Sequence, residues 1–381
     1  MKILAVDVGT GTQDILLFDS DKEVENCYKL VLPSPTVMLA QQIRAATQQG
    51  IGVVLSGVLM GGGPCAWAAR DHVQAGYPLW VTPDAARTFD DDPARVEAMG
   101  ATIVGEDEAT AINGQAIHLT MGDFDYRAIA AAFARFGVDL NHDLDAIAIA
   151  VFDHGNAPPG VSDRLFRFEY IETRIQTRNS LTSFAFPAEQ VPPMMTRLEA
   201  TARTARAARP DLPVLLMDTA PAAVLGALED PHVAQTRPAI VANIGNFHCL
   251  AFRLGPTNGD PAGGIEGVFE HHTGEITPSQ LEGYLRRLAQ GNLSHTEIFD
   301  SNGHGAVMFA HHPIPLDFLS ITGPRRNFLR GSALNPYLAT PFGDMMLAGS
   351  YGLIRAYTSI RSDWAEAIDQ ALQGQGGKSL W

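Results

Sequence analysis

The chain has 381 residues, of which 46% are hydrophobic and 18% charged, a composition that fits a globular protein with room for two hydrophobic cores. Its formal net charge of −15 argues against non-specific binding to nucleic acid or to an anionic membrane. The three cysteines are too widely separated for a zinc pair or an iron–sulfur site, and they suit a reducing compartment. We therefore expect a cytoplasmic protein with a small-molecule partner.

The first part of the chain predicts neither a signal peptide nor a membrane span. Asp7 interrupts any apolar signal-peptide core. The long uncharged stretch 45–69 contains several glycines and Pro64. It is better explained as a helix end, a buried strand, a loop and the start of a second helix.

Residues 3–19, ILAVDVGTGTQDILLFD, predict a β-hairpin with a glycine-rich turn. The first apolar run ends at Asp7, and the turn then contains Gly9, Thr10, Gly11 and Thr12. The two glycines allow backbone N–H groups to converge on an anion, and the two threonines add hydroxyl donors. Asp7 can hold a hydrated divalent cation. The pattern indicates a triphosphate cradle, with an ordinary glycine-rich hairpin as the alternative.

Apolar runs separated by glycine and proline predict alternating strands and helices along the rest of the chain. The expected strands are 25–32, 51–59, 79–82, 145–152, 214–217 and 316–322. The expected helices are 37–48, 65–75, 94–99, 194–208, 219–228 and 279–290. Asp92 is the expected cap of the helix at 94–99, with Pro93 in its first turn.

Two strands end in segments that suggest ligand contact. Met60 to Pro64 follows the buried strand 51–59, and Asp153, His154 and Asn156 follow the strand 145–152. Open α/β sheets bind ligands at the carboxyl ends of their strands. Asp153, His154 and Asn156 are therefore candidate substrate residues, and a simple polar turn is the alternative. The arginine- and aromatic-rich stretch 164–209 is interpreted as a solvated face or an insertion lining one side of a cleft.

The second half of the chain repeats the opening pattern. In residues 239–254 an apolar run stops at Asn243, and Gly245 follows it as Gly9 follows Asp7. Two such hairpins in two domains favour the phosphate cradle over chance. Asp218 ends the strand before this hairpin, on the expected ligand side of the sheet, and a helix cap is its other explanation.

Six histidines follow between residues 271 and 312. Imidazoles suit zinc, iron or nickel, but no H-x-x-x-H helix spacing is present, and neighbouring histidines on a strand point to opposite faces. The candidates for substrate contact are His271, His272 and His304. After the strand 316–322, Gly323, Pro324 and Arg325 suit the adenosine end of a nucleotide.

In this order, the motifs resemble those of the actin, sugar-kinase and heat-shock-chaperone ATPase superfamily. Val6 to Thr12 resembles its first phosphate motif and Asn243 to Phe252 its second. Met217 to Leu228 and Gly343 to Gly352 resemble its two connecting segments, and Ile321 to Arg326 its adenosine motif. The whole chain is also similar to a smaller prokaryotic family labelled "putative pyruvate formate-lyase activating enzyme". We do not accept the activity that this label implies, because a radical activating enzyme needs three clustered cysteines.

The resemblance implies an α/β protein with two ribonuclease-H-like domains, each with a mixed sheet, and ATP with Mg²⁺ in the cleft between them. Asp7 would hold the magnesium through water, and residues 9–12 would bind the β- and γ-phosphates. Gly245, Asn246 and Phe247 would close on them from the second domain. Asp218 would orient or deprotonate the attacking hydroxyl. One departure is Asn243, where the superfamily usually has an aspartate, so one carboxylate near the metal is missing.

The expected domains are 1–235 with an insertion around 155–210, 236–342, and a helical segment 343–381 that packs between the domains or on the first. The leading hypothesis is an ATP- and magnesium-dependent phosphotransferase or ATPase acting on a small molecule. A nucleotide or metabolite sensor without turnover is the second hypothesis, and a metal-dependent enzyme using the histidines at 271–312 is the third. The sequence leaves open the substrate, the turnover and the oligomeric state.

Overall fold

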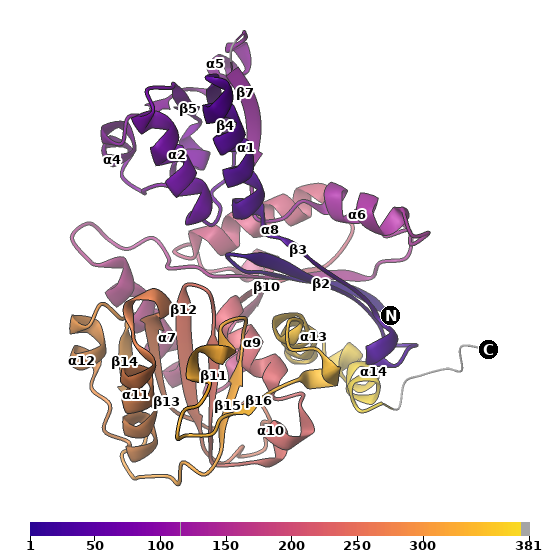
Figure 1. Cartoon of the computed structure of the whole chain (residues 1–381). Coiled ribbons are helices and arrows are strands. Elements are labelled where there is room, and N and C mark those ends of the chain that lie inside the picture. The colour runs from indigo at the N-terminus through magenta and orange to yellow at the C-terminus, as the bar shows by residue number, and fades with distance from the viewer. Residues whose placement is uncertain (115, 375–381) are drawn as a thin grey trace.

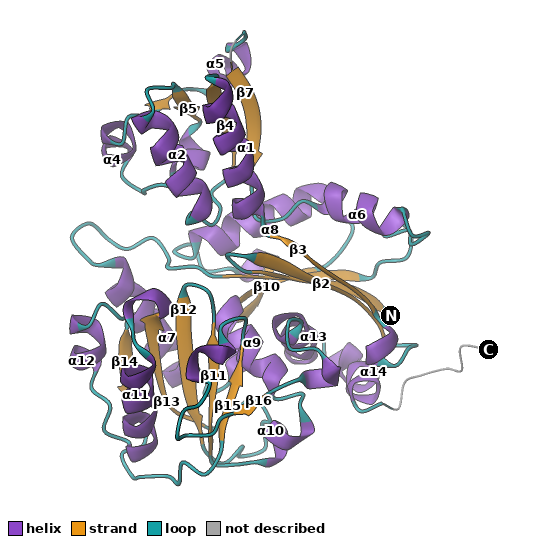
Figure 2. Cartoon of the chain, viewed as in Figure 1, coloured by secondary structure: helices purple, strands orange, loops and turns teal. Residues whose placement is uncertain are grey.

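The computed structural model describes residues 1–114 and 116–374, which form three β-sheets with helices around them (Figures 1 and 2). Short 3-10 turns connect several elements: η1 (Val24–Asn26), η2 (Leu181–Phe184), η3 (Ala188–Gln190), η4 (Thr273–Glu275), η5 (Arg326–Leu329) and η6 (Pro341–Gly343). Within the described residues, no helix combines the length and the apolar character that a bilayer crossing requires.

The first six-stranded sheet has the order β3-β2-β1-β8-β10-β9. Its strands are β1 (Lys2–Val8), β2 (Thr12–Asp19), β3 (Tyr28–Pro33), β8 (Ala146–Val151), β9 (Ala185–Pro187) and β10 (Val214–Asp218). Strands β1, β2 and β3 form an antiparallel meander, and β8 and β10 add on parallel to β1. Its helices are α6 (Tyr126–Ala134), α7 (Asp163–Thr177), α8 (Thr196–Ala208) and α9 (Thr219–Ala227). Three antiparallel strands followed by two parallel ones is the ribonuclease-H-like order.

The central strands of this sheet are apolar throughout because both faces are buried. Ile3 and Ala5 of β1 join one hydrophobic cluster, which also contains residues of α7, α9 and the second domain. Leu4 and Val6 join a different cluster on the opposite face, under α6 and α8. The expected buried strands are thus confirmed, and the reason is that helices cover the sheet on both sides.

The second six-stranded sheet repeats this order as β14-β13-β12-β11-β15-β16. Its strands are β11 (Ala239–Ile244), β12 (His248–Leu254), β13 (Ile265–His272), β14 (Gly305–Met308), β15 (Leu319–Thr322) and β16 (Tyr337–Leu338). Its helices are α10 (Pro231–Gln235), α11 (Pro278–Gln290) and α12 (His295–Asp300). Apart from β14 at one edge of this sheet and β9 at the opposite edge of the first, the order and directions of the strands match. The expected fold of two ribonuclease-H-like domains with mixed sheets is confirmed.

A third sheet, of four parallel strands, forms a separate unit at the top of Figure 1. Its order is β6-β5-β4-β7, with β4 (Gly52–Gly57), β5 (Leu79–Val81), β6 (Thr102–Ile103) and β7 (Ala116–Met121). Its helices are α1 (Pro35–Gln49), α2 (Pro64–Gln74), α3 (Pro83–Ala86), α4 (Pro93–Ala98) and α5 (Glu106–Ala111). Most of these elements were expected from the sequence, but their grouping into an inserted unit was not. Local sequence patterns do not show which strands pair with one another.

The stretch around 155–210, expected as an insertion, contributes α7, β9 and α8, and β9 pairs with β10 of the first sheet. The helix α7 was not expected, because its arginines and aromatic residues were read as a solvated face. In the helical segment expected at 343–381, the first helix begins later than residue 343: α13 (Ala348–Ile360) follows the turn η6, and α14 (Ser362–Leu372) follows α13. The domain boundaries stay a prediction, and residues 375–381 of the last segment lie outside the described residues.

Two helices of small residues, α9 and α13, cross at close range where the two domains meet. A Cβ atom added at Gly226 of α9 would lie 1.7 Å from the carbonyl oxygen of Ala348, and one added at Gly352 of α13 would lie 1.9 Å from that of Ala222. Helix α13 also packs on β1 and β8, while α9 reaches β11 and β15. This crossing therefore ties the C-terminal helix and both domains together.

We predict that Gly226→Ala destabilises the protein by at least about 3 kcal/mol, because backbone atoms of α13 occupy the space of the new methyl group. The matched control is Gly283→Ala in α11, where the methyl group would meet no described atom within 4 Å. This control should change stability by no more than about 1 kcal/mol, in the stabilising direction. Urea unfolding midpoints test the pair, and equal effects of the two substitutions would contradict the close crossing.

Candidate functional site

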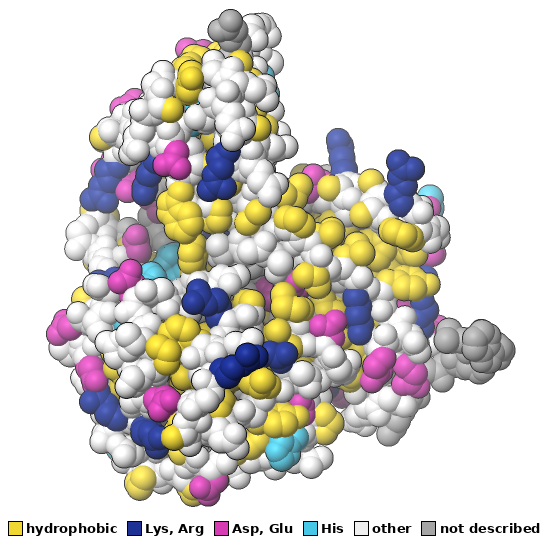
Figure 3. Space-filling view, viewed as in Figure 1, with side chains coloured by type: hydrophobic (Ala, Val, Ile, Leu, Met, Phe, Trp, Pro, Cys, Tyr) yellow, Lys and Arg dark blue, Asp and Glu magenta, His cyan; other side chains and the backbone are white. Residues whose placement is uncertain are grey.

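A cavity of about 1330 Å³ is lined by both six-stranded domains and by the inserted unit. Its walls come from the two glycine hairpins, the loop after β4, the segment 87–95, the loop after β8 and the start of α13. Figure 3 shows the hollow between the upper unit and the body of the molecule, with histidine side chains in its wall. The candidate site is this cavity.

The two hairpin turns have the same backbone geometry. The N–H of Gly9 donates to the carbonyl of Thr12 at 2.9 Å, and the N–H of Gly245 donates to that of His248 at 2.9 Å. The turns also meet, since a Cβ atom on Gly11 would lie 2.9 Å from Nδ2 of Asn246. From the two turns, the cavity is lined by Gly9, Thr10, Thr12, Gly245, Asn246 and Phe247. The repeated sequence pattern thus forms two turns that lie next to each other and line one cavity.

Asp7 lies at the base of the first turn, 8% exposed, and accepts a hydrogen bond from the hydroxyl of Thr219. Gly349 of α13 packs so closely that a Cβ atom there would lie 1.9 Å from Asp7 Oδ2. Burial raises the pKa of Asp7 to about 7, and the nearby charge of Asp218 adds to the shift. A bound cation would favour the ionised form.

Asp14 is a site residue that the sequence reasoning missed. It pairs directly with Asp7 across the hairpin, so both carboxyl groups lie on the same face. Burial and the charge of Asp7 raise the pKa of Asp14 to about 8. Among the described residues, its Oδ1 atom has no hydrogen-bond partner. The hairpin register was the signal: a turn centred on residues 9–12 places position 14 opposite position 7.

The expected adenosine segment lies beside the second hairpin. Gly323 has a positive φ of 97°, and a Cβ atom there would lie 2.4 Å from Asn243 Oδ1. Asn243, Gly323 and Pro324 line the cavity. Arg325 is exposed, and its guanidinium lies 5.9 Å from the ring centre of Phe328. In this conformation the side chain of Arg325 contacts its own segment.

Arg167 of α7, which sequence analysis did not single out, is completely buried behind the cavity wall. Its guanidinium forms ion pairs with Asp218 at 2.6 Å and with Glu270 of β13 at 2.8 Å. It also donates to the carbonyl of Asp153 at 2.7 Å and lies 3.8 Å from the ring centre of Phe152. Asp218 in addition caps α9 through the N–H of Ala220. The predicted role of Asp218 as a base stays a prediction, and its visible contacts are those of an ion pair and a helix cap.

Asp153 is an anchor for the loop after β8. Its carboxylate accepts backbone N–H bonds from Gly155 at 2.8 Å and from Arg197 and Leu198 at 2.9 Å each. It is 3% exposed, and burial raises its pKa although these donors oppose the shift. The loop is therefore fixed, and it presents His154 and Asn156 to the cavity.

The two adjacent histidines of β13 point to opposite faces, as expected. His272 lines the cavity. His271 turns into the domain, where its ring nitrogens meet the hydroxyl of Ser301 at 3.2 Å and the carbonyl of His272 at 3.0 Å. His271 is 0% exposed, so the structure places it away from the substrate position predicted for it.

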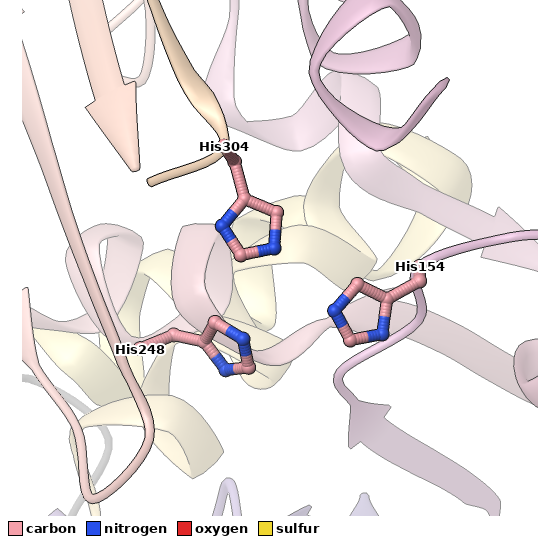
Figure 4. A group of neighbouring side chains, drawn as sticks. All are labelled: His154, His248 and His304. Carbon is pink, nitrogen blue, oxygen red and sulfur yellow. The ribbon is translucent and has the colours of Figure 1, made fainter. Parts of the chain in front are cut away.

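His154, His248 and His304 come together from three distant segments, and their rings point toward one another (Figure 4). Ring centres of His154 and His304 are 5.5 Å apart, and those of His248 and His304 are 5.1 Å apart. His272 lies beside them, 4.6 Å from His304. Burial lowers the pKa of His154 to about 3, and it lowers the pKa values of His248 and His304 well below their usual range. These imidazoles are neutral at ordinary pH.

The inserted unit covers the two hairpins from above. A Cβ atom on Gly63 would lie 2.7 Å from the ring of Phe247, and the rings of Trp67 and Phe247 pack edge to face at 5.4 Å. Gly61 donates its N–H to Asp123, whose carboxylate pairs with Arg197 at 2.7 Å. The glycine-rich loop after β4 thus closes the cavity, as its place at a strand end suggested.

A family model described as "Putative pyruvate format-lyase activating enzyme (DUF1786)" matches residues 60–328. No curated protein matches the chain. Similar solved structures include an activator of 2-hydroxyisocaproyl-CoA dehydratase from Clostridium difficile with bound ADPNP. That structure has 9% identity, covers 98% of this chain and 97% of its own, and has a TM-score of 0.34.

Two further structures show the same weak likeness. The ethanolamine utilization protein EutJ from Carboxydothermus hydrogenoformans has 12% identity, coverages of 93% and 89%, and a TM-score of 0.31. The ROK hexokinase from Thermus thermophilus has 13% identity, coverages of 95% and 100%, and a TM-score of 0.29. The strand orders, and not these scores, carry the assignment of two ribonuclease-H-like domains.

We predict that Asp7→Asn stabilises the ligand-free protein at pH 8 by up to about 4 kcal/mol, at about 1.4 kcal/mol per pKa unit. The usual pKa of 3.8 rises to about 7 on folding, so the folded state keeps a proton that the unfolded state loses between these values. The free energy of unfolding of the wild type therefore falls as the pH rises from about 4 to 7. Urea unfolding at pH 5 and pH 8 tests this, and an equal gain at both values would contradict it.

We predict that Arg167→Met destabilises the protein by about 3–5 kcal/mol, because Asp218 and Glu270 would stay buried without a partner cation. The triple variant Arg167→Met, Asp218→Asn, Glu270→Gln should recover a large part of this loss. Arg361→Met is the control, since it removes an exposed pair with Asp363 and should cost at most about 1 kcal/mol. Thermal unfolding compares the three, and a triple variant as unstable as the single one would contradict the ion-pair explanation.

Proposed function

The chain belongs to the family described as "Putative pyruvate format-lyase activating enzyme (DUF1786)", and we propose that it binds ATP with Mg²⁺ in the cavity between its two ribonuclease-H-like domains and transfers or hydrolyses the terminal phosphate. The observation that carries the proposal is the pair of matching glycine turns that lie next to each other and line one cavity. Backbone N–H groups in such turns are suited to phosphate oxygens.

Asp7 supplies the negative charge for magnesium in this proposal. Mg²⁺ keeps several waters and is commonly held through one or two carboxylates plus the phosphates. Asp7 and Asp14 are such a pair of carboxyl groups, and they lie next to the first turn. Burial raises the pKa of both. A cation would offset the cost of ionising both carboxyl groups. In this proposal the binding of the metal is therefore coupled to the binding of the nucleotide. Phosphoryl transfer needs mainly this positioning and charge neutralisation.

The acceptor would lie at the other end of the same cavity, where His154, Asn156 and His272 form the wall. Neutral imidazoles and an amide can orient a small polar molecule through hydrogen bonds. Asp218 sits close enough to Asp7 to shift its pKa, yet it is paired with Arg167. In the catalytic proposal, Asp218 becomes a base only if this ion pair rearranges when substrate binds.

A sensor that binds nucleotide without turnover is the second candidate. The observation that favours it is Asn243, an amide at the position that corresponds to Asp7 in the second hairpin. The ion pair between Asp218 and Arg167 points in the same direction, because the guanidinium contacts both oxygens of the carboxylate. Both candidates share the nucleotide site and differ only in turnover.

The radical chemistry that the family description suggests is not part of the proposal. An iron–sulfur cluster needs several thiolates around one centre. Cys27, Cys65 and Cys249 are buried in three different hydrophobic clusters, one on the first domain's sheet, one in the inserted unit and one in the second domain. Burial raises the pKa of Cys65 to about 11 and that of Cys249 to about 12, so these thiols stay protonated.

The test is calorimetric titration of the protein with ATP and with ADP, with and without Mg²⁺. We expect magnesium-dependent binding that Asp7→Asn weakens at least about 100-fold, because a metal-holding carboxylate is lost. Asp143→Asn, on an exposed surface aspartate, is the matched control and should bind as the wild type does. The proposal fails if the wild type binds neither nucleotide under any condition.

ADP formation at saturating ATP, which accompanies both transfer and hydrolysis, then separates the two candidates. ADP formation by the wild type, lost in Asp218→Asn while ATP still binds, supports a catalytic role. Binding of ATP without ADP formation, alone and with every small-molecule acceptor tried, supports the sensor.

A further inference from the structure

A group of three histidines stands at one end of the cavity, and of these only His154 has a part in the proposed function, as wall of the acceptor end. We propose that His154, His248 and His304 bind one divalent transition-metal ion, of the class Zn²⁺, Co²⁺, Ni²⁺ or Fe²⁺. One ligand nitrogen from each ring can be chosen so that all three lie within 4.8 Å of one another. In a tetrahedral zinc site, ligand nitrogens lie about 3.4 Å apart, so small ring rotations complete the arrangement.

The ring nitrogens lack the partners that buried imidazoles usually have. His304 is 0% exposed, and neither of its ring nitrogens has a hydrogen-bond partner among the described residues. The same holds for Nε2 of His248. Leaving a buried polar atom without a partner is destabilising. By contrast, the nearby His271 has protein partners at both nitrogens. The nitrogens at the centre of the cluster are therefore the ones available to a metal ion.

The backbone around the cluster is built to hold the rings in place. His304 stands between two glycines: a Cβ atom on Gly303 would lie 2.5 Å from Ile298, and one on Gly305 would lie 2.5 Å from His295. Gly155, after His154, has a φ of 76°, and a Cβ atom there would lie 2.7 Å from the ring of Phe166. Asp153 fixes the same loop through its three N–H bonds.

The guanidinium next to the cluster belongs to Arg167 and is paired within the protein. The ring of Phe152 stacks on His248, with 3.8 Å between the ring centres, and its centre lies 3.8 Å from this guanidinium. The ion pairs of Arg167 with Asp218 and Glu270 offset its positive charge when both carboxylates are ionised.

Three protein ligands leave at least one coordination position open, as in catalytic metal sites. His154 and His248 line the cavity, so this position faces the space where a small anion or a phosphate oxygen can enter. The ligands also come from both ribonuclease-H-like domains, since His154 follows β8 while His248 and His304 belong to the β12–β14 side. The metal would therefore join the two domains across the cavity.

The third hypothesis from the sequence placed a metal site among the histidines at 271–312. The three histidines that converge are a different set. Only His304 of that group belongs to the three that converge, with His272 beside it. The other two ligands come from the loop after β8 and from the second hairpin, where sequence spacing gives no sign of a shared centre.

The test is titration of the metal-free, tag-free full chain with Co²⁺, followed by visible absorption and by calorimetry, and repeated with Zn²⁺. We expect one Co²⁺ per chain with the visible bands of a low-coordinate nitrogen site. His154→Ala and His248→Gln should each weaken binding at least about 100-fold, since changes to outer partners alone cost about 10–100-fold. Co²⁺ should raise the unfolding temperature of the wild type and leave that of His154→Ala unchanged.

His312→Ala, on a histidine whose side chain is 64% exposed, is the matched control and should bind Co²⁺ as the wild type does. Asp7→Asn should also retain Co²⁺ binding, which separates this proposal from the nucleotide proposal. Circular dichroism confirms that each variant is folded. The metal site is refuted if the wild type binds neither ion, or if folded His154→Ala and His248→Gln bind Co²⁺ as tightly as the wild type.

Discussion

The buried guanidinium of Arg167 is the interaction on which the site depends. It joins a carboxylate of the first domain, Asp218, to one of the second, Glu270, and both pairs lie out of contact with water. A buried charge is tolerated only when it is paired and fully hydrogen-bonded, so the three side chains hold the two sheets in one relative position. The same cation supports Phe152, on which His248 stacks, and it adds to the effect of burial, which is the main cause of the lowered pKa of His248. Arg167 thus links the geometry of the two domains to the cavity wall.

The first hairpin differs from Arg167, because the buried carboxyl groups there have no paired cation among the described residues. Asp7 and Asp14 are buried side by side, and no cationic side chain appears among the contacts that shift their pKa values. Natural proteins carry such a cost where function needs it. A magnesium ion with its nucleotide would supply the missing positive charge. The destabilised pair and the well-paired Arg167 therefore mark two different parts of the cavity, one arranged for an incoming cation and one arranged for rigidity.

The family description and the chemistry of the chain point in different directions. The description names a radical activating enzyme, whereas the cysteines are dispersed among three hydrophobic clusters and the cavity is lined by glycine turns, carboxylates and neutral imidazoles. The proposed nucleotide site and the proposed metal site share this cavity but use separate residues. If both are occupied, the open position of the metal faces the same space as the terminal phosphate, which makes the histidine end of the cavity the natural place for the second substrate.

Local sequence patterns were enough to predict the elements and their order: the two glycine hairpins, the buried strands, the cap at Asp92 and the small-residue helix after Asp218. These features depend on residues close together in the chain, and the resemblance of their order to known motifs predicted the fold. The other features depend on long-range contacts that are seen only in the folded chain. The separate sheet of the inserted unit, the pairing of Arg167 with Glu270 and the meeting of His154, His248 and His304 all join segments far apart in sequence. Such contacts leave no periodic pattern, because each side chain is positioned by the packing of whole elements.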